Sequence, residues 1–357
     1  MVRYPYMLID LDKIRRNTEI IVDLASKYDI SVVGVVKGVM GDLHVTGAMI
    51  SGGVSGLADA NPRRLARIKR RFPDISTMFI RLPMLSEASY VVRHTDISIN
   101  SEIDTIRALS RQARRIGKKH KKLLMVEVGD LREGMMPDEV VPIVKDIISL
   151  DGVEIYGIAA NFACYSGLIP EERHFDMLNA LRDEIEDIIG KEILLSGGNS
   201  ANIDLLLSGK HPPIDELRIG EAILCGTESL ERKKIPGTFQ DAFRVYGEVI
   251  EVRKKPTTPG GRTAQSGFGE YKKFTDRGRR WRAIVAIGAE DIDPKALKPT
   301  MPGIEIEDAA SDHMVIDIED AEEDIKVGDV LEFVAHYNSI MRGMLSPYLR
   351  KVYAGGD

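Results

Sequence analysis

The strongest constraint on the fold is an alternation of strand-like and helix-like segments between residues 31 and 220. Short apolar runs alternate there with longer stretches in which apolar residues recur at helical spacing. A helical pattern follows each of the first seven strand segments. The eight strand segments are SVVGVVK (31–37), GVSGLAD (53–59), STMFIRL (76–82), TDISIN (95–100), KKLLMVEVG (121–129), VEIYGIAAN (153–161), EILLSGGN (192–199) and DELRIG (215–220). Eight such units in succession predict an α/β fold with a TIM-type (β/α)8 barrel rather than an open sheet.

The pattern changes after about residue 235, where helical segments become scarce. The strand-like segments there are FRVYGEVIEVRKKP (243–256), RRWRAIVAIGAED (279–291), SDHMVIDIED (311–320) and KVGDVLEFVAHY (326–337). A long irregular segment at 257–278 joins the first two, and segments of that length are often functional. We therefore expect two domains: a barrel at 1–235, with a leading strand and helix, and a mainly β domain at 236–357.

Composition argues against several classes of protein. The formal net charge is −6 with both signs mixed along the chain, and basic clusters such as RRLARIKRRF (63–72) have helical spacing, so we expect no nucleic-acid partner. The two cysteines, Cys164 and Cys225, form no CxxC motif, so neither a disulfide framework nor a metal site is expected. The first residues lack the apolar core of a signal peptide, and no apolar run reaches bilayer length. We expect a cytoplasmic protein without a membrane partner.

The carboxyl ends of the barrel strands should carry the chemistry, because TIM-barrel active sites lie there. Lys37 ends the first strand segment, in VVGVVKGVMGD (32–42), where a buried ammonium without a partner is costly. SGGNSAN (196–202) and RIGEA (218–222) follow the last two strand segments, where TIM barrels commonly bind phosphate. A strand-end lysine alone usually lies at the surface, and GGNS alone is usually a turn. Their meeting at one rim favours pyridoxal phosphate held by the lysine as a Schiff base.

These motifs resemble those of alanine racemases and other fold-type III pyridoxal phosphate enzymes, over nearly the whole chain. Within that group, GDLREG, SGGNS, LRIGEAI, ASDHMVID and SPYLRKVY are similar to the ornithine racemase branch. The resemblance implies a racemase that interconverts the L and D forms of ornithine, or of another basic amino acid such as lysine, by α-proton abstraction. It also implies a homodimer, in which the second domain of one subunit closes the active site of the other.

The resemblance also implies roles for single residues that would bind the cofactor. Lys37 would form the Schiff base and act as one catalytic base. Arg218 would face the pyridine nitrogen, and Asn161 stands where alanine racemases have a histidine against the ring. The phosphate contacts would come from Ser200, from the backbone amides of Gly220 and Glu221, and from Tyr348 in SPYLRK. At the position where alanine racemases have a further phosphate-binding tyrosine, this chain has Gly41.

The substrate side of the site departs further from alanine racemases. Arg132 in GDLREG matches an arginine near the substrate carboxylate, and Asp312 lies in a stretch beside that carboxylate. The second catalytic base of alanine racemases is a tyrosine, but the matching motif here reads SGFGEY and places Phe268 there, which cannot carry a proton. His313 is our first candidate for this base, because imidazole both donates and accepts protons near neutrality. Tyr271 is the second candidate.

Several alternatives stay open at this stage. An alanine or broad-specificity racemase shares these motifs, and a non-enzymatic pyridoxal phosphate-binding protein resembles the barrel alone. Aldolases and dehydratases of this fold type carry a His and Cys metal pair near the C-terminus, which is not evident here. Amino-acid decarboxylases have longer chains and a cysteine motif in the second domain. A basic substrate is favoured by acidic residues expected at the rim, which are Asp42, Glu127, Asp130, Glu133, Glu221 and Asp312.

Overall fold

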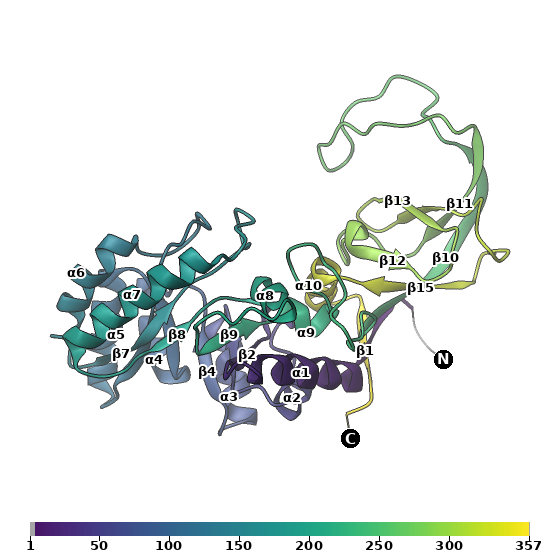
Figure 1. Ribbon diagram of the computed structural model, residues 1–357. Helices are drawn as coiled ribbons and strands as arrows, with labels where there is room; N and C mark the ends of the chain where they lie inside the picture. Colours follow the sequence, from purple (N-terminus) through teal and green to yellow (C-terminus); the bar gives the residue numbers. More distant parts are fainter. Residues whose placement is uncertain (1–3, 357) are drawn as a thin grey trace. The chain divides into compact units, whose positions relative to one another are not determined.

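The structure, a computed structural model, describes residues 4–356 of the chain. These residues form two compact units, one made of residues 11–239 together with Gly356 and the other of residues 4–10 together with 240–355. Figure 1 shows the chain coloured from its N-terminus to its C-terminus. The first unit is called the barrel unit below, and the second the β unit.

The barrel unit contains a closed barrel of eight parallel strands, as the sequence predicts. The strands follow one another around the barrel in chain order. They are β2 (Ser31–Val35), β3 (Gly56–Asp59), β4 (Ser76–Phe79), β5 (Ile97–Asn100), β6 (His120–Met125), β7 (Val153–Ala159), β8 (Leu194–Ser196) and β9 (Glu216–Ile219). One apolar cluster joins residues from six of these strands, including Val35, Met78 and Leu123. Each such side chain contributes about 1.5–3 kcal/mol of burial energy to the unit.

Helices separate successive strands of the barrel, and one further helix precedes the first barrel strand and another follows the last. They are α1 (Leu11–Ser26), α2 (Leu43–Ser51), α3 (Pro62–Arg71), α4 (Ala88–His94), α5 (Ile103–Arg115), α6 (Pro137–Ile147), α7 (Glu172–Ile189), α8 (Ile203–Leu207) and α9 (Glu221–Cys225). Side-chain caps define two of these starts: Asp42 accepts the amides of the first turn of α2, and Asn61 precedes Pro62 at the start of α3. Within residues 4–356, no helix combines the length and apolar character needed to cross a bilayer.

The β unit is mainly antiparallel sheet, as expected for the C-terminal part. Its strands lie in the order β12 (Leu297–Pro299), β15 (Val330–Ala335), β10 (Phe243–Pro256), β11 (Arg279–Val285), β14 (Met314–Asp317) and β13 (Glu305–Ala309). β16 (Arg350–Ala354) belongs to the same sheet. The sequence did not predict the helix α10 (Tyr337–Leu345) or the short strands β12, β13 and β16.

The leading strand β1 (Tyr6–Asp10) differs from the expectation, which assigned it to the barrel domain. It pairs antiparallel with β10, where Tyr6 lies opposite Tyr246, and parallel with β16, where Tyr6 lies opposite Arg350. Both partners are more than two hundred residues away in sequence. Because the backbone groups of a strand find partners through space, no local pattern reveals which sheet it joins.

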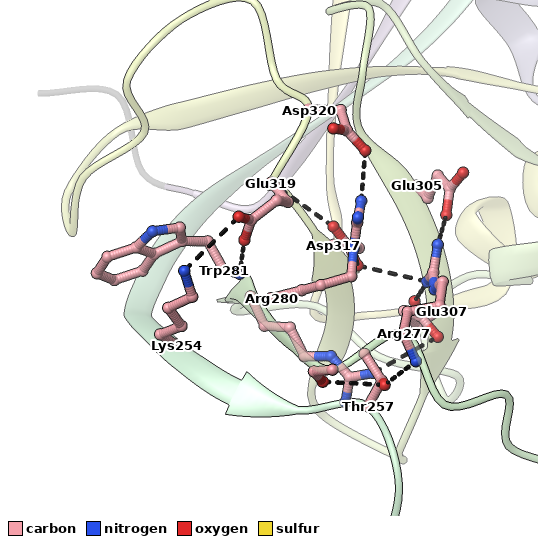
Figure 2. Close-up of polar contacts among 12 residues, drawn as sticks. Lys254, Thr257, Arg277, Arg280, Trp281, Glu305, Glu307, Asp317, Glu319 and Asp320 are labelled. Carbon is pink, nitrogen blue, oxygen red and sulfur yellow. Dashed lines mark hydrogen bonds and ion pairs between the residues drawn. The ribbon is translucent and has the colours of Figure 1, made fainter.

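The two ends of the β10–β11 loop, residues 257–278, are joined by hydrogen bonds. The amide of Thr257 donates to the carbonyl of Gly278 at 3.0 Å, and the amide of Arg277 donates to Thr257 Oγ1 at 2.7 Å. The Arg277 guanidinium also pairs with the buried Asp317 at 3.4 Å, within the network that Figure 2 shows. The loop extends away from its sheet in Figure 1, so its two ends are held while its middle projects.

Candidate active site

Lys37 lies in a turn at the carboxyl end of β2, and the turn is held by its backbone. Lys37 begins a short 3₁₀ helix. Arg64 donates to the Lys37 carbonyl at 3.3 Å, while Arg67 donates to the carbonyls of Met40 and Gly41 at 3.1 and 2.7 Å. In the described part of the chain, no hydrogen bond or ion pair involves the Lys37 ammonium. The main chain is therefore fixed while the half-buried amine remains available for chemistry.

Two turns that each lead into a short helix follow β9, the neighbour of β2 in the barrel, and β8, the neighbour of β9. Strands β2 and β9 are neighbours, and a β carbon added at Gly220 would lie only 3.0 Å from the carbonyl oxygen of Val35. The amide of Ala222 donates to Ser200 Oγ at 3.3 Å, which joins the turn after β9 to the turn after β8. Because the first amides of a helix have no partner within it, these turns offer N–H groups to an anion.

Arg218 on β9 is buried and rigidly held. Its Nη1 donates to the Ser196 carbonyl at 3.0 Å, and its Nη2 donates to the Ala160 carbonyl and to Asn161 Oδ1, the latter at 3.1 Å. Burial lowers the pKa of Arg218, partly opposed by the charge of Glu216. A guanidinium nevertheless stays protonated in proteins, so Arg218 presents donors only.

Arg132 and Asn161 both contact Glu133, which the sequence analysis considered only as one of the acidic rim residues. Arg132 binds both carboxylate oxygens of Glu133 through Nε and Nη2. Asn161 Nδ2 donates to Glu133 Oε1 at 3.1 Å. Burial alone lowers the pKa of Arg132, but the hydrogen bond to Glu133 and nearby negative groups raise it overall. The structure thus brings Arg132, Asn161 and Arg218 together through Glu133.

Comparison with known proteins identifies the family. Residues 9–228 match the alanine racemase N-terminal domain. The chain belongs to the alanine racemase family. It is 37% identical over 352 residues to lysine racemase from Thermotoga maritima, and 98% of each chain is covered. It is 36% identical over 353 residues to ornithine racemase from Acetoanaerobium sticklandii, covering 98% of this chain and 99% of the relative.

Solved structures of more distant proteins confirm the fold of this family member. Alanine racemase from Streptomyces lavendulae superposes with a TM-score of 0.73 at 18% identity, covering 100% of this chain and 98% of that one. D-threonine aldolase from Filomicrobium marinum superposes with a TM-score of 0.72 at 16% identity, covering 96% of this chain and 89% of that one. The fold is therefore shared by proteins with different reactions, and the site must decide the chemistry.

The expected acidic rim of this alanine racemase family member has local partners throughout. Asp130 Oδ1 accepts the amides of Cys164, Tyr165 and Ser166 at 3.1 to 3.2 Å, and Glu127 accepts the amides of Leu131 and Arg132. The remaining pairings are Asp42 with the start of α2, Glu133 with Arg132, Glu221 with Arg232 and Asp312 with His313. These contacts weaken the hypothesis that the rim carboxylates await a distal ammonium.

The other predicted site residues lie in the β unit. His313 Nδ1 is 2.8 Å from Asp312 Oδ1, and both side chains are exposed on the turn between β13 and β14. Tyr271 is exposed in the β10–β11 loop, close in sequence to Phe268. Tyr348 is exposed just before β16, where its amide donates to Ser346 Oγ at 3.1 Å. Their roles remain predictions.

Proposed function

We propose that this protein is a pyridoxal phosphate-dependent racemase that interconverts the L and D forms of a basic amino acid, ornithine or lysine. The observation that carries this proposal is the match to a lysine racemase and an ornithine racemase at 37% and 36% identity, each over nearly the whole chain. Side chains at the barrel mouth that fit the cofactor also support this proposal.

The donors at the barrel mouth fit pyridoxal phosphate. Lys37 supplies a primary amine without a partner in residues 4–356. The paired turns at Ser200 and Gly220 supply a hydroxyl and backbone amides for a phosphate, and the close approach of Gly220 to Val35 makes a side chain there a tight fit. Arg218 supplies a fixed guanidinium. When bound, this cofactor stabilises the negative charge left on the α carbon after the proton departs.

The residues of the barrel divide the remaining work in this proposal. Lys37 holds and returns the α proton on one face of the substrate. Arg218 would face the ring nitrogen as a donor that keeps its own proton, and it would thereby favour simple return of the α proton. Arg132 would bind the substrate carboxylate, and Asn161 would lie against the ring.

Proton transfer on the opposite face requires a second base, which we propose to be His313. Asp312 accepts from its Nδ1 at 2.8 Å, which orients the ring and leaves Nε2 for a proton. Phe268 has no proton to give, and Tyr271 remains the alternative. Tyr348 is proposed as a further phosphate contact.

We further propose that the protein is a homodimer in which each β unit completes the site of the partner. Its β10–β11 loop exposes three aromatic side chains, Phe268, Tyr271 and Phe274, at 57%, 76% and 48%. Grouped exposed aromatics are typical of interaction sites. Full activity in a monomeric form would contradict this assembly.

The function is tested with a panel of single enantiomers of ornithine, lysine, alanine and other amino acids. Purified protein with pyridoxal phosphate is expected to abolish the optical rotation of L-ornithine or L-lysine and of the D form alike. Lys37→Ala is expected to abolish this activity and the borohydride-reducible cofactor adduct. Racemisation of alanine but of neither basic amino acid would support an alanine racemase instead, and inactivity on the whole panel would refute the proposal.

A further inference from the structure

A continuous chain of four side chains crosses the barrel mouth from Arg132 to Arg218. Arg132 contacts Glu133, Glu133 accepts from Asn161, and Asn161 accepts from Arg218. Glu133 is the one acidic residue among these four side chains. Its side chain is 18% exposed, so its pairing with Arg132 is more shielded from solvent than an ordinary surface ion pair.

The hydrogen-bond chemistry leaves little choice for the residue at position 133. Arg218 only donates, so Asn161 must turn its Oδ1 toward Arg218, at 3.1 Å, and its Nδ2 toward position 133. Arg132 also only donates, and it approaches position 133 with Nε and Nη2. Position 133 therefore faces three N–H donors, which a carboxylate accepts and an amide cannot, because one end of an amide is itself a donor.

The pairing also determines which edge of Arg132 remains available. Glu133 occupies the edge formed by Nε and Nη2. Nη1 has no hydrogen bond to any residue that the structure describes, so the edge formed by Nη1 and Nη2 can receive a second carboxylate. Guanidinium edges match carboxylates in a bidentate geometry.

We propose that Glu133 is a positioning residue. It holds Arg132 with one edge toward the substrate carboxylate, and it holds Asn161 with its Oδ1 toward Arg218. This inference rests on the proposed function, because it takes an amino acid as the substrate. Glu133 contacts neither substrate nor cofactor in this role, and it acts through Arg132 and Asn161.

The test compares the holoenzyme with the variants Glu133→Gln and Glu133→Ala. The probe is pentanoate, which has the carboxylate and carbon chain of ornithine but neither ammonium group, so it reports carboxylate binding without reaction and without any contact between an ammonium and Glu133. Its affinity is measured by calorimetry, and the KM for ornithine or lysine is measured beside it. Thermal unfolding confirms that the variants are folded. Glu19→Gln is the matched control, because Glu19 accepts from Arg15 at 2.6 Å on the outer helix α1.

Both variants at position 133 are expected to bind the probe about tenfold more weakly, because an unrestrained arginine must lose rotamer freedom on binding, about 1.4 kcal/mol. Their KM should rise by a similar factor, while Glu19→Gln should match the wild type. The direction is diagnostic. Removing a negative charge beside Arg132 would by itself strengthen carboxylate binding, so weaker binding reports lost orientation.

Unchanged or tighter probe binding by folded Glu133→Gln and Glu133→Ala would overturn the inference. Glu133 would then only stabilise its own loop. Failure of the proposed function is seen separately, as a wild-type enzyme that racemises neither ornithine nor lysine.

Discussion

The buried carboxylate of Asp59 gives the sharpest quantitative prediction. Asp59 ends β3 with a fully buried side chain. Its Oδ1 accepts from Arg64 at 3.3 Å and from the amide of Asn61 at 2.8 Å, but its Oδ2 has no hydrogen-bond partner. Burial raises the pKa of Asp59 from 3.8 to about 6, although Arg64 and the backbone amides pull the pKa down.

The magnitude follows from linkage between protonation and folding. The folded state holds the Asp59 proton more tightly than the unfolded state, so the stabilisation is complete below pH 3.8 and is lost as the pH rises through about 6. A rise of about two pKa units corresponds to about 3 kcal/mol of lost stability at neutral pH. Asp59→Asn removes this titration, so its free energy of unfolding relative to the wild type should increase by about 2.5 kcal/mol between pH 4 and pH 7, where most of the change falls.

The assay is urea unfolding of both proteins at a series of pH values, followed by far-UV circular dichroism at one fixed cofactor concentration. Asp317→Asn is a control of opposite sign, since Arg280 and other partners outweigh burial and lower the pKa of Asp317. The free energy of unfolding of Asp317→Asn should therefore decrease less than that of the wild type as the pH falls. Parallel stability curves for the wild type and Asp59→Asn would refute the reasoning.

Three further predictions follow from single side chains. Lys122→Met should stabilise the protein, because burial disfavours the charged form of Lys122 and lowers its pKa. The gain, measured by urea unfolding, should shrink as the pH rises toward 10.5. Arg218→Glu should change the visible spectrum of the bound cofactor and increase transamination, and an unchanged spectrum and product ratio would count against its role. His313→Asn should block α-proton exchange in deuterated water from one enantiomer and leave exchange by Lys37 from the other. Racemisation at the wild-type rate would show that His313 is not the second base and would favour Tyr271.

Some of these properties are local in the sequence. Apolar runs that alternate with helical segments predicted all eight barrel strands. A parallel strand that is buried on both faces requires such a nearly continuous apolar run. Lys37 and the SGGNS motif were recognisable because their strand-end positions follow from the same periodicity. The short helix α9 was not predicted.

Other features depend on contacts through space. Asp42, Glu127 and Asp130 read as rim acids in the sequence, yet in the structure they accept amides of their own or neighbouring loops. No sequence spacing shows that Glu133 lies between Arg132 and Asn161, because Asn161 is supplied by another loop.

The sequence by itself determined the barrel, the mainly β second unit and the residue types at the strand ends, since these depend on periodicity and on where each strand stops. Only the tertiary structure decided that β1 joins the β unit, that each rim acid has at least one local partner and that Glu133 links Arg132 to Asn161. The physical reason is the same in each case. A backbone amide or a charged side chain takes whichever partner the fold brings within about 3 Å, and that distance is independent of separation along the chain.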